Sequence, residues 1–288
     1  GILPNVFVFN YAVVLGSSLE ALFWSLGLAG RMKAGFESEA EIRILESELS
    51  TARRVQQTIL SPAAGRLRVG PMNVHITYLP MNDKVSGDYY NVALDPGGRL
   101  SVFIADSTGH GLHAAMTTMQ IDTIKKNMRP GDPAAGLAEF NEAFIESLHS
   151  YNFFTAFWFF MEGENLSYSG AAHPPQFLVR RGTGEVIPWQ CRGLPLGVVP
   201  GQTPRLTTTA IEHGDVIVLY TDGIDESVNP RNDLYGTERF KDRLKEWRRD
   251  SVPPMEWNEL ALKDLSEFRE GEPRSDDITL ITLEYDPQ

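Results

Sequence analysis

The sequence predicts an α+β fold in which stacked antiparallel β-sheets are flanked by α-helices. Two observations support this. From about residue 70, short apolar segments alternate with turn residues, and two helical segments interrupt them after Gly111. An order of strands, then helices, then further strands is typical of sheets that pack face to face with helices outside. A long N-terminal helical region is expected to precede this domain.

The N-terminal segment, residues 1–34, is predicted to hold a transmembrane helix. Residues 6–29 form a predominantly apolar run of 24 residues, long enough to span a hydrocarbon core of roughly 30 Å. Arg31 and Lys33 follow this run, which places its C-terminal side in the cytoplasm. The expected localisation is therefore the inner (cytoplasmic) membrane. Glu20 supports the alternative of a buried or dimerising soluble helix, because a carboxylate in lipid is costly unless it faces other helices.

Residues 35–62 are predicted to form a coiled-coil linker. Mostly apolar or small side chains recur at spacings of 3, 4, 3, 4 and 3 residues, at Ile42, Leu45, Leu49, Ala52, Gln56 and Ile59. This spacing matches the a and d positions of a heptad repeat and favours a parallel homodimer. The alternative is a single amphipathic helix that lies on its own domain. Ser61-Pro62 and Gly65 end the helix, and a domain of residues 63–288 follows.

Strand and helix patterns fill this domain in a definite order. The strands NVHITYLP, SGDYYNVAL and RLSVFIAD come first, with DPGG at residues 95–98 as a hairpin turn. Two helices follow, LHAAMTTMQIDTIKKNM and PAAGLAEFNEAFIESLHS. The segment from Phe153 to Trp189 is predicted to form strands broken by EGEN, AAHPP and RGTG. An apolar strand then ends at Asp222-Gly223, one helix follows, and DDITLITLEYD forms the last strand.

The composition excludes several classes of function. The 288 residues are 42% hydrophobic and 22% charged, which is typical of a globular protein with a sizeable core. The net charge of -12 argues against a general nucleic-acid-binding protein, which needs a basic surface. The single cysteine, Cys191, allows neither an intrachain disulfide nor a cysteine-rich zinc site.

Aspartates stand where apolar strands meet turns, at Asp88, Asp106, Asp222 and Asp276 or Asp277. Stacked sheets can bring such strand ends together at one rim. Carboxylates gathered without a basic partner repel one another, and hard divalent cations, which prefer oxygen ligands, remove that repulsion. Mg²⁺ or Mn²⁺ held there can activate a water for attack on a phosphorus atom. The alternative is that each Asp-Gly pair only forms a turn.

Six motifs occur in one order: VSGDYYN, IADSTGHG, AAHPPQFLV, GLPLGV, LYTDGIDE and SDDITL. In these motifs the chain, from ARRVQQTILSP to its C-terminus, resembles the metal-dependent PPM-type serine/threonine phosphatases of the SpoIIE/RsbU branch. The resemblance implies a PPM-like αββα sandwich and a centre of two Mn²⁺ or Mg²⁺ ions. It implies that the catalytic metal ligands are Asp88, Asp106, Asp222, Asp276 and the backbone carbonyl of Ser107, with Asp106 bridging both metals. Asp277 is left as a turn residue or a support for the ligands.

The sequence departs from this branch at two places near the first aspartate. Ser86-Gly87 stands where two glycines are usual, and Asn91 stands where an aspartate is usual. Neither change removes an implied ligand, although both can alter the geometry around it. The basic phosphate clamp of eukaryotic relatives has no counterpart that the sequence identifies.

The N-terminal stretch LPNVFVFNYAVVLGSSLEALFWSLGLAGRM resembles the last membrane helix of seven-transmembrane receptors with diverse intracellular signalling modules, which implies six further helices before Gly1. Together the resemblances imply a membrane-tethered signalling phosphatase that acts on a phosphorylated anti-sigma-factor antagonist. One alternative is a catalytically weak or inactive phosphatase-fold module that acts by dimerisation and partner binding. Another is a metal-dependent phosphodiesterase or nuclease, against which the acidic charge counts.

Overall fold

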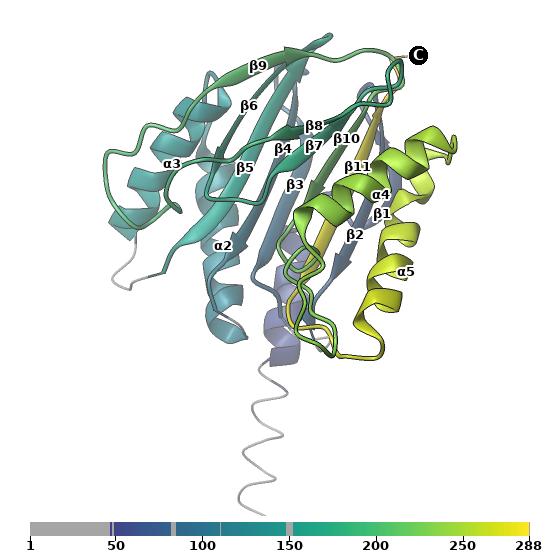
Figure 1. Ribbon diagram of the computed structural model, residues 1–288. Coiled ribbons are helices and arrows are strands. Elements are labelled where there is room, and N and C mark those ends of the chain that lie inside the picture. The colour runs from purple at the N-terminus through teal and green to yellow at the C-terminus, as the bar shows by residue number, and fades with distance from the viewer. Residues whose placement is uncertain (1–46, 48, 82–84, 110, 148–151, 288) are drawn as a thin grey trace, which may run out of the picture. The chain divides into compact units, whose positions relative to one another are not determined.

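The computed structural model describes residues 47, 49–81, 85–109, 111–147 and 152–287. Residues Ser50–Gln288 form one compact unit. Two antiparallel sheets pack face to face, with helices on their outer faces (Figure 1). This confirms the predicted fold class of the domain. The predicted membrane segment, residues 6–29, lies outside the described residues, and no helix within the described ranges is long and apolar enough to cross a membrane.

The first sheet has the strand order β3-β4-β5-β6-β9. Its strands are β3 (Asp88–Leu94), β4 (Leu100–Ser107), β5 (Phe154–Glu162), β6 (Asn165–Ala171) and β9 (Thr207–Ala210). Two helices pack against it, α2 (Leu112–Asn127) and α3 (Pro133–Ser147). Because one face meets helices and the other meets the second sheet, β5 is apolar along most of its length instead of alternating.

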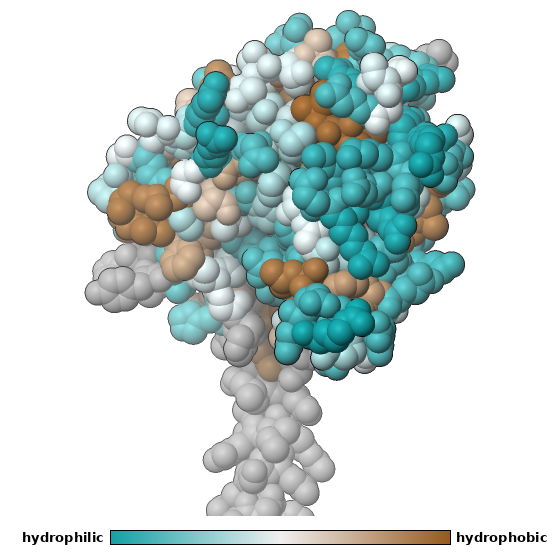
Figure 2. Space-filling model, viewed as in Figure 1, coloured by the Kyte–Doolittle hydropathy of each residue, from teal (hydrophilic) through white to brown (hydrophobic). Residues whose placement is uncertain are grey.

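The second sheet has the strand order β1-β2-β11-β10-β7-β8. Its strands are β1 (Gly65–Val69), β2 (Met72–Leu79), β11 (Ile278–Tyr285), β10 (Val216–Tyr220), β7 (Gln176–Val179) and β8 (Val186–Trp189). The helices α4 (Thr237–Arg249) and α5 (Trp257–Arg269) cover its outer face. They bury apolar side chains such as Phe240 and Leu244 and present a mainly hydrophilic surface (Figure 2).

The prediction of one helix between β10 and β11 is wrong. The chain has two helices there. The first, α4, ends at Arg249, and Ser251 then has a left-handed backbone with φ of 57°. Pro253-Pro254 follows and leads through the short 3₁₀ turn η2 (Pro254–Glu256) into α5. Two edge strands, β1 and β9, were also not predicted. The sequence of β9 is TTTA, which has no apolar alternation, and pairing with β6 makes it a strand.

Aromatic side chains fill the layer between the first sheet and its helices. Phe103 of β4 stacks on Phe140 of α3 with ring centroids 5.7 Å apart, and the edge of Trp158 meets Phe103 at 5.2 Å. The alternate positions of β4, Val102 and Ile104, face the second sheet and are fully buried. The polar residue that continues this inward row is Asp106, so the core ends in a carboxylate.

The helix before β1 lies on its own domain at Gln56. Residues 49–59 are helical, and Gln56 is 2% exposed because its amide bonds to the domain. Position 56 therefore fits the alternative prediction, a single amphipathic helix that lies on its own domain, better than a coiled-coil position that faces a second chain. The compact unit also begins at Ser50, before the predicted boundary at residue 62. The coiled-coil positions Ile42 and Leu45 lie outside the described residues.

Candidate metal centre

Antiparallel pairing places the predicted ligands at one rim of the sandwich. Asp88 begins β3 and lies opposite Asp106 in the ladder with β4. In the other sheet, Asp222 follows β10 and Asp276 precedes β11, and these two strands also pair antiparallel. Hydrogen bonds from the second sheet to Asp88 bring the two pairs to the same rim.

Asp88 is the buried member of the group and joins the two sheets. Its side chain is 1% exposed, and its Oδ2 accepts hydrogen bonds from Thr221 Oγ1 at 2.8 Å and from Thr279 Oγ1 at 2.6 Å. A buried carboxylate without partners would be strongly unfavourable, so these two hydroxyls offset part of its desolvation. Sequence reasoning missed both threonines. Their position inside the motifs LYTDG and DDIT was the available signal.

The aspartates raise one another's pKa values. Burial raises the pKa of Asp88 well above its usual range, and Asp277 adds to the effect. Burial likewise raises the pKa of Asp106, with further contributions from Asp88, Asp222 and Asp276. The pKa of Asp222 rises to about 7 through burial and then through Asp276. The largest effects thus come from burial and from other carboxylates, and both make it costly for all of these aspartates to be ionised at once.

The neighbouring residues Asp276 and Asp277 differ in what they contact. Asp277 is 8% exposed, and its two oxygens accept the backbone N–H groups of Met81 at 2.5 Å and Gly87 at 2.7 Å. Asp276 lies exposed and accepts the N–H of Asp277 at 2.8 Å. Asp277 therefore holds the backbone that leads into Asp88, whereas Asp276 stands at the surface of the rim.

Two glycines beside these aspartates allow the backbones to approach closely. A Cβ on Gly223 would overlap the carbonyl oxygen of Asp277, and a Cβ on Gly87 would lie 2.8 Å from the carbonyl oxygen of Ser107. Ser107 is the residue whose carbonyl was predicted to bind metal, and its N–H donates to the Gly87 carbonyl at 3.0 Å. The Asp-Gly pattern therefore serves close packing at the rim as well as turn formation.

Gln56 connects the preceding helix to the segment that carries Asp88. Its Oε1 accepts the N–H of Ser86 at 3.0 Å, and its Nε2 donates to the Ser86 carbonyl at 2.6 Å and to Thr118 Oγ1 of α2 at 2.8 Å. Ser86 Oγ in turn accepts the N–H of Asp88 at 3.0 Å. Sequence reasoning missed this connection, which joins residues 30 positions apart.

The donor set fits a hard divalent cation. Carboxylates and a carbonyl are the ligand types that Mg²⁺ and Mn²⁺ prefer, and the mutual repulsion shown by the raised pKa values is what a cation would relieve. Within the described part of the chain, however, no three acidic, histidine or cysteine side chains converge tightly enough to coordinate one ion. The ligands are thus gathered at one rim without being drawn around a common point.

The fold is that of the PP2C phosphatases. The SiaA-PP2C domain of Pseudomonas aeruginosa superposes with a TM-score of 0.72 at 23% identity, over 86% of this chain and 99% of that one. The catalytic domain of the serine/threonine protein phosphatase PstP, solved with two manganese ions, has a TM-score of 0.52 at 16% identity. That likeness covers 74% of this chain and 97% of PstP.

The chain belongs to the Stage II sporulation protein E (SpoIIE) family, whose model matches residues 96–286. It is 26% identical over 247 residues to the phosphoserine phosphatase RsbU of Bacillus subtilis (strain 168), which covers 83% of this chain and 70% of RsbU. It spans 44% of the curated relative IcfG and 57% of RsbP. Family and fold together define a phosphoprotein phosphatase domain.

The raised carboxylate pKa values predict how stability depends on pH when no metal is present. A group whose folded-state pKa exceeds its unfolded value takes up a proton more readily when folded. In EDTA the free energy of unfolding should therefore rise as the pH falls from 8 to 6.5, by up to about 1.4 kcal/mol per pH unit for each such group. Asp222, with a folded pKa of about 7, should contribute directly in this window. Denaturant titrations at a series of pH values measure the slope.

Asp222→Asn should flatten this slope, and saturating Mn²⁺ should remove it because the cation replaces the protons. The window stops at pH 6.5 because buried His173, whose pKa falls to about 3 through desolvation, opposes the trend below that point. A parent protein that loses stability between pH 8 and 6.5 would contradict the predicted electrostatics.

Proposed function

We propose that this chain is a signalling phosphatase that hydrolyses phosphoserine or phosphothreonine on a protein at a two-metal centre. The observation that carries the proposal is the meeting of carboxylates from both sheets at one rim, where burial and mutual repulsion raise their pKa values. Asp88, Asp106, Asp222, Asp276 and the carbonyl of Ser107 would hold Mn²⁺ or Mg²⁺. When bound, such ions neutralise phosphoryl oxygens and lower the pKa of a coordinated water.

The residues around these ligands prepare them for that role. Thr221 and Thr279 fix one oxygen of Asp88, so its carboxylate keeps one orientation. Asp277 holds the N–H of Gly87 and so positions the same segment from the other side. This arrangement supplies a preorganised, partly buried set of oxygen donors, which is what binding and orienting a phosphate ester through metal ions requires.

The proposed substrate is a phosphorylated anti-sigma-factor antagonist. Support comes from the similarity to RsbU, which is named a phosphoserine phosphatase, and from the likeness to the solved RsbU and RsbW domains of Rv1364c from Mycobacterium tuberculosis. The net charge of -12 supports a protein substrate over nucleic acid, because a general nucleic-acid-binding surface is basic.

Control from a membrane sensor completes the proposal. The apolar run of residues 6–29 and the heptad spacing that follows it support a membrane-tethered homodimer with its catalytic domain in the cytoplasm. The described end of this linker reaches the candidate site through Gln56, which bonds to Ser86 beside Asp88. A shift of the helix would therefore move the backbone that carries a metal ligand.

Hydrolysis should depend on metal and on the bridging carboxylate. The chain should release phosphate from an aryl phosphate and from a phosphoserine protein in Mn²⁺, and EDTA should stop both reactions. Asp106→Asn should abolish activity, whereas Asp250→Asn, at the exposed residue that follows α4, should leave it unchanged. Steady-state phosphate release measures each variant.

The neighbours Asp276 and Asp277 provide a matched pair in the same assay. Asp276→Asn should lose more activity than Asp277→Asn, whose loss should be about 10- to 100-fold because it only supports the ligands. Asp277→Asn should instead cost about 1–3 kcal/mol of stability, since it weakens a buried acceptor of two N–H groups. Activity that survives EDTA or Asp106→Asn would refute the two-metal site.

Gln56→Leu should reduce both activity and Mn²⁺ affinity, because it removes the bonds that hold Ser86. Gln57→Leu is the matched control, since Gln57 is the exposed neighbour on the same helix. Mn²⁺ titrations of kcat separate the two effects. Equal activity and Mn²⁺ affinity in both variants would show that the helix is only a tether.

The proposed dimer seam is tested in parallel. Leu45→Asp with Leu49→Asp should convert a dimer into a monomer in sedimentation experiments and change the rate. A parent chain that is already monomeric would contradict a coiled-coil homodimer.

The membrane proposal is tested with inverted membrane vesicles made from cells that express the chain with its native upstream sequence. Added protease should digest the phosphatase domain, because the cytoplasmic face is outermost, and should spare residues 6–29. Recovery of the intact protein in the soluble fraction, with residues 6–29 readily cleaved, would favour a soluble dimerisation helix.

A further inference from the structure

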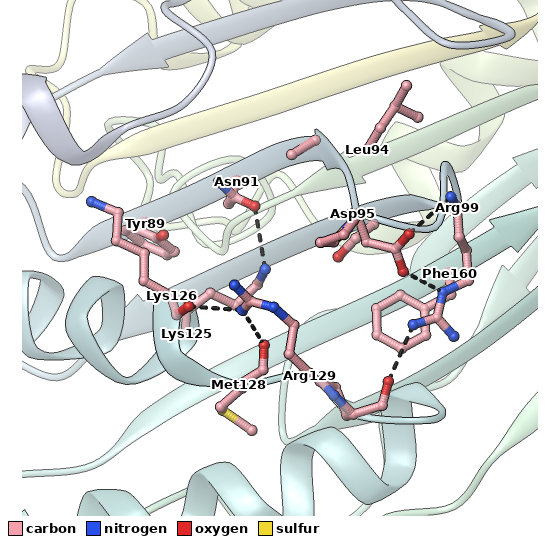
Figure 3. Close-up of a pocket in the computed structure, with 14 residues that line it drawn as sticks. Tyr89, Asn91, Leu94, Asp95, Arg99, Lys125, Lys126, Met128, Arg129 and Phe160 are labelled. Carbon is pink, nitrogen blue, oxygen red and sulfur yellow. Dashed lines mark hydrogen bonds and ion pairs between the residues drawn. The ribbon is translucent and has the colours of Figure 1, made fainter.

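A cavity of about 270 Å³ opens on the helix-bearing face of the first sheet, between the β3–β4 hairpin and the C-terminal end of α2 (Figure 3). Its lining runs along β3 from Tyr89 and Asn91 to the hairpin at Leu94. Successive strand residues point to opposite faces of a sheet, so Tyr89 and Asn91 face the helices and Asp88 faces the other side. The cavity is therefore distinct from the candidate metal centre.

Basic side chains dominate the lining of this cavity. Arg99, Lys125, Lys126 and Arg129 contribute four cations, and Asp95 is the one carboxylate among the described lining residues. Such a cluster is unusual in a chain whose net charge is -12. Only those cations that have no carboxylate partner within the protein remain available to an anionic ligand.

Two of the four cations have carboxylate partners. Arg99 Nε lies 2.9 Å from Asp95 Oδ2, and its other nitrogens donate to backbone carbonyls. Lys126 Nζ lies 2.7 Å from Asp122 Oδ2 at the edge of the cavity. The carboxylates of Asp95 and Asp122 are thus already paired with Arg99 and Lys126.

Lys125 and Arg129 form no ion pair with a carboxylate among the described residues. Arg129 donates to the backbone carbonyls of Lys126 and Met128. Lys125 Nζ donates to the neutral amide oxygen of Asn91 at 3.3 Å (Figure 3). It also lies 4.8 Å from the centroid of the Trp158 ring. Burial, reinforced by Arg129 and opposed only in part by Asp122, lowers the pKa of Lys125 to about 8. The cavity thus holds two positive charges, one of them largely desolvated, that an anion would neutralise.

The rest of the lining limits the size and nature of the ligand. Apolar atoms from Leu94, Met128 and Phe160 form part of the wall, and Leu94 is 47% exposed. The volume falls just below the usual range of about 300–1,000 Å³ for drug-sized ligands. The cavity therefore suits a small molecule with an anionic group and a short apolar part.

We propose that this cavity binds a small phosphate monoester, with its phosphate between Lys125 and Arg129. A phosphate that carries close to two negative charges matches two uncompensated cations better than a single carboxylate does. Asn91 is the residue that keeps the cavity receptive, because a carboxylate at that position would pair with Lys125 and occupy its charge. This ligand would be held by the chain itself, independently of metal ions and of the hydrolytic reaction.

The test measures binding of inorganic phosphate, and then of glycerol 3-phosphate, to the full chain in EDTA at pH 7 by isothermal titration calorimetry. EDTA removes any metal-dependent binding at the rim, where the bare carboxylates repel phosphate. One saturable site per chain is expected, with tighter binding of glycerol 3-phosphate because of its carbon skeleton. Acetate at the same concentrations should bind at least tenfold more weakly.

Three variants identify the site. Asn91→Asp keeps every cation but supplies an internal carboxylate to Lys125, and it should weaken phosphate binding at least tenfold while preserving or raising the melting temperature. Lys125→Met should weaken binding similarly. Arg129→Gln changes an exposed side chain and should also weaken it without a risk of unfolding. Lys263→Met on α5, which removes an equal charge elsewhere, should bind as the parent does.

Three results would overturn the proposal. The first is the absence of saturable phosphate binding by the parent chain in EDTA. The second is parental affinity in both Asn91→Asp and Arg129→Gln, which would place any bound phosphate elsewhere. The third is acetate binding as tight as phosphate binding, which would refute the assignment of a phosphate ester.

Discussion

Two hydrogen bonds to one buried carboxylate join the sheets where the chemistry is expected. Thr221 and Thr279 belong to the second sheet and its adjoining turn, and both donate to Asp88 at the start of the first. Each threonine stands within three residues of a predicted ligand, Asp222 or Asp276. The same bonds that satisfy Asp88 therefore bring the other carboxylates to it, and the candidate site depends on the sandwich being closed at this rim.

The rim is electrostatically unfavourable without a cation, and the rest of the domain must offset that cost. Raised pKa values at Asp106 and Asp222 mean that their ionised forms destabilise the folded state. The compensation lies in the apolar layers, where Phe103, Phe140 and Trp158 pack as a fully or nearly fully buried aromatic group. Electrostatic repulsion at a functional site, offset by well-packed apolar layers elsewhere, is expected in a folded enzyme.

Charge is distributed unevenly along the first sheet. Asp88 at the start of β3 lies among other carboxylates, whereas Asn91 and the hairpin end of the same strand line a cavity with Lys125 and Arg129. The two regions share a strand but have opposite charge and different neighbours. The acidic net charge of the whole chain therefore does not describe the local charge of either region, and it is the local groups that decide which ligand can bind.

Local patterns in the sequence were sufficient to predict the sandwich, most of its strands and an acidic rim, because alternation, turn residues and strand-end aspartates are short-range signals. Family resemblance was needed to choose Asp276 over Asp277. Only the tertiary structure decided which groups support the ligands. Thr279 reaches Asp88 across 191 positions and Gln56 reaches Ser86 across 30, and no local pattern records such pairs. Gln56 has heptad spacing in sequence, yet its amide bonds to the backbone of its own domain, because those partners become neighbours only when the two sheets and the preceding helix are packed.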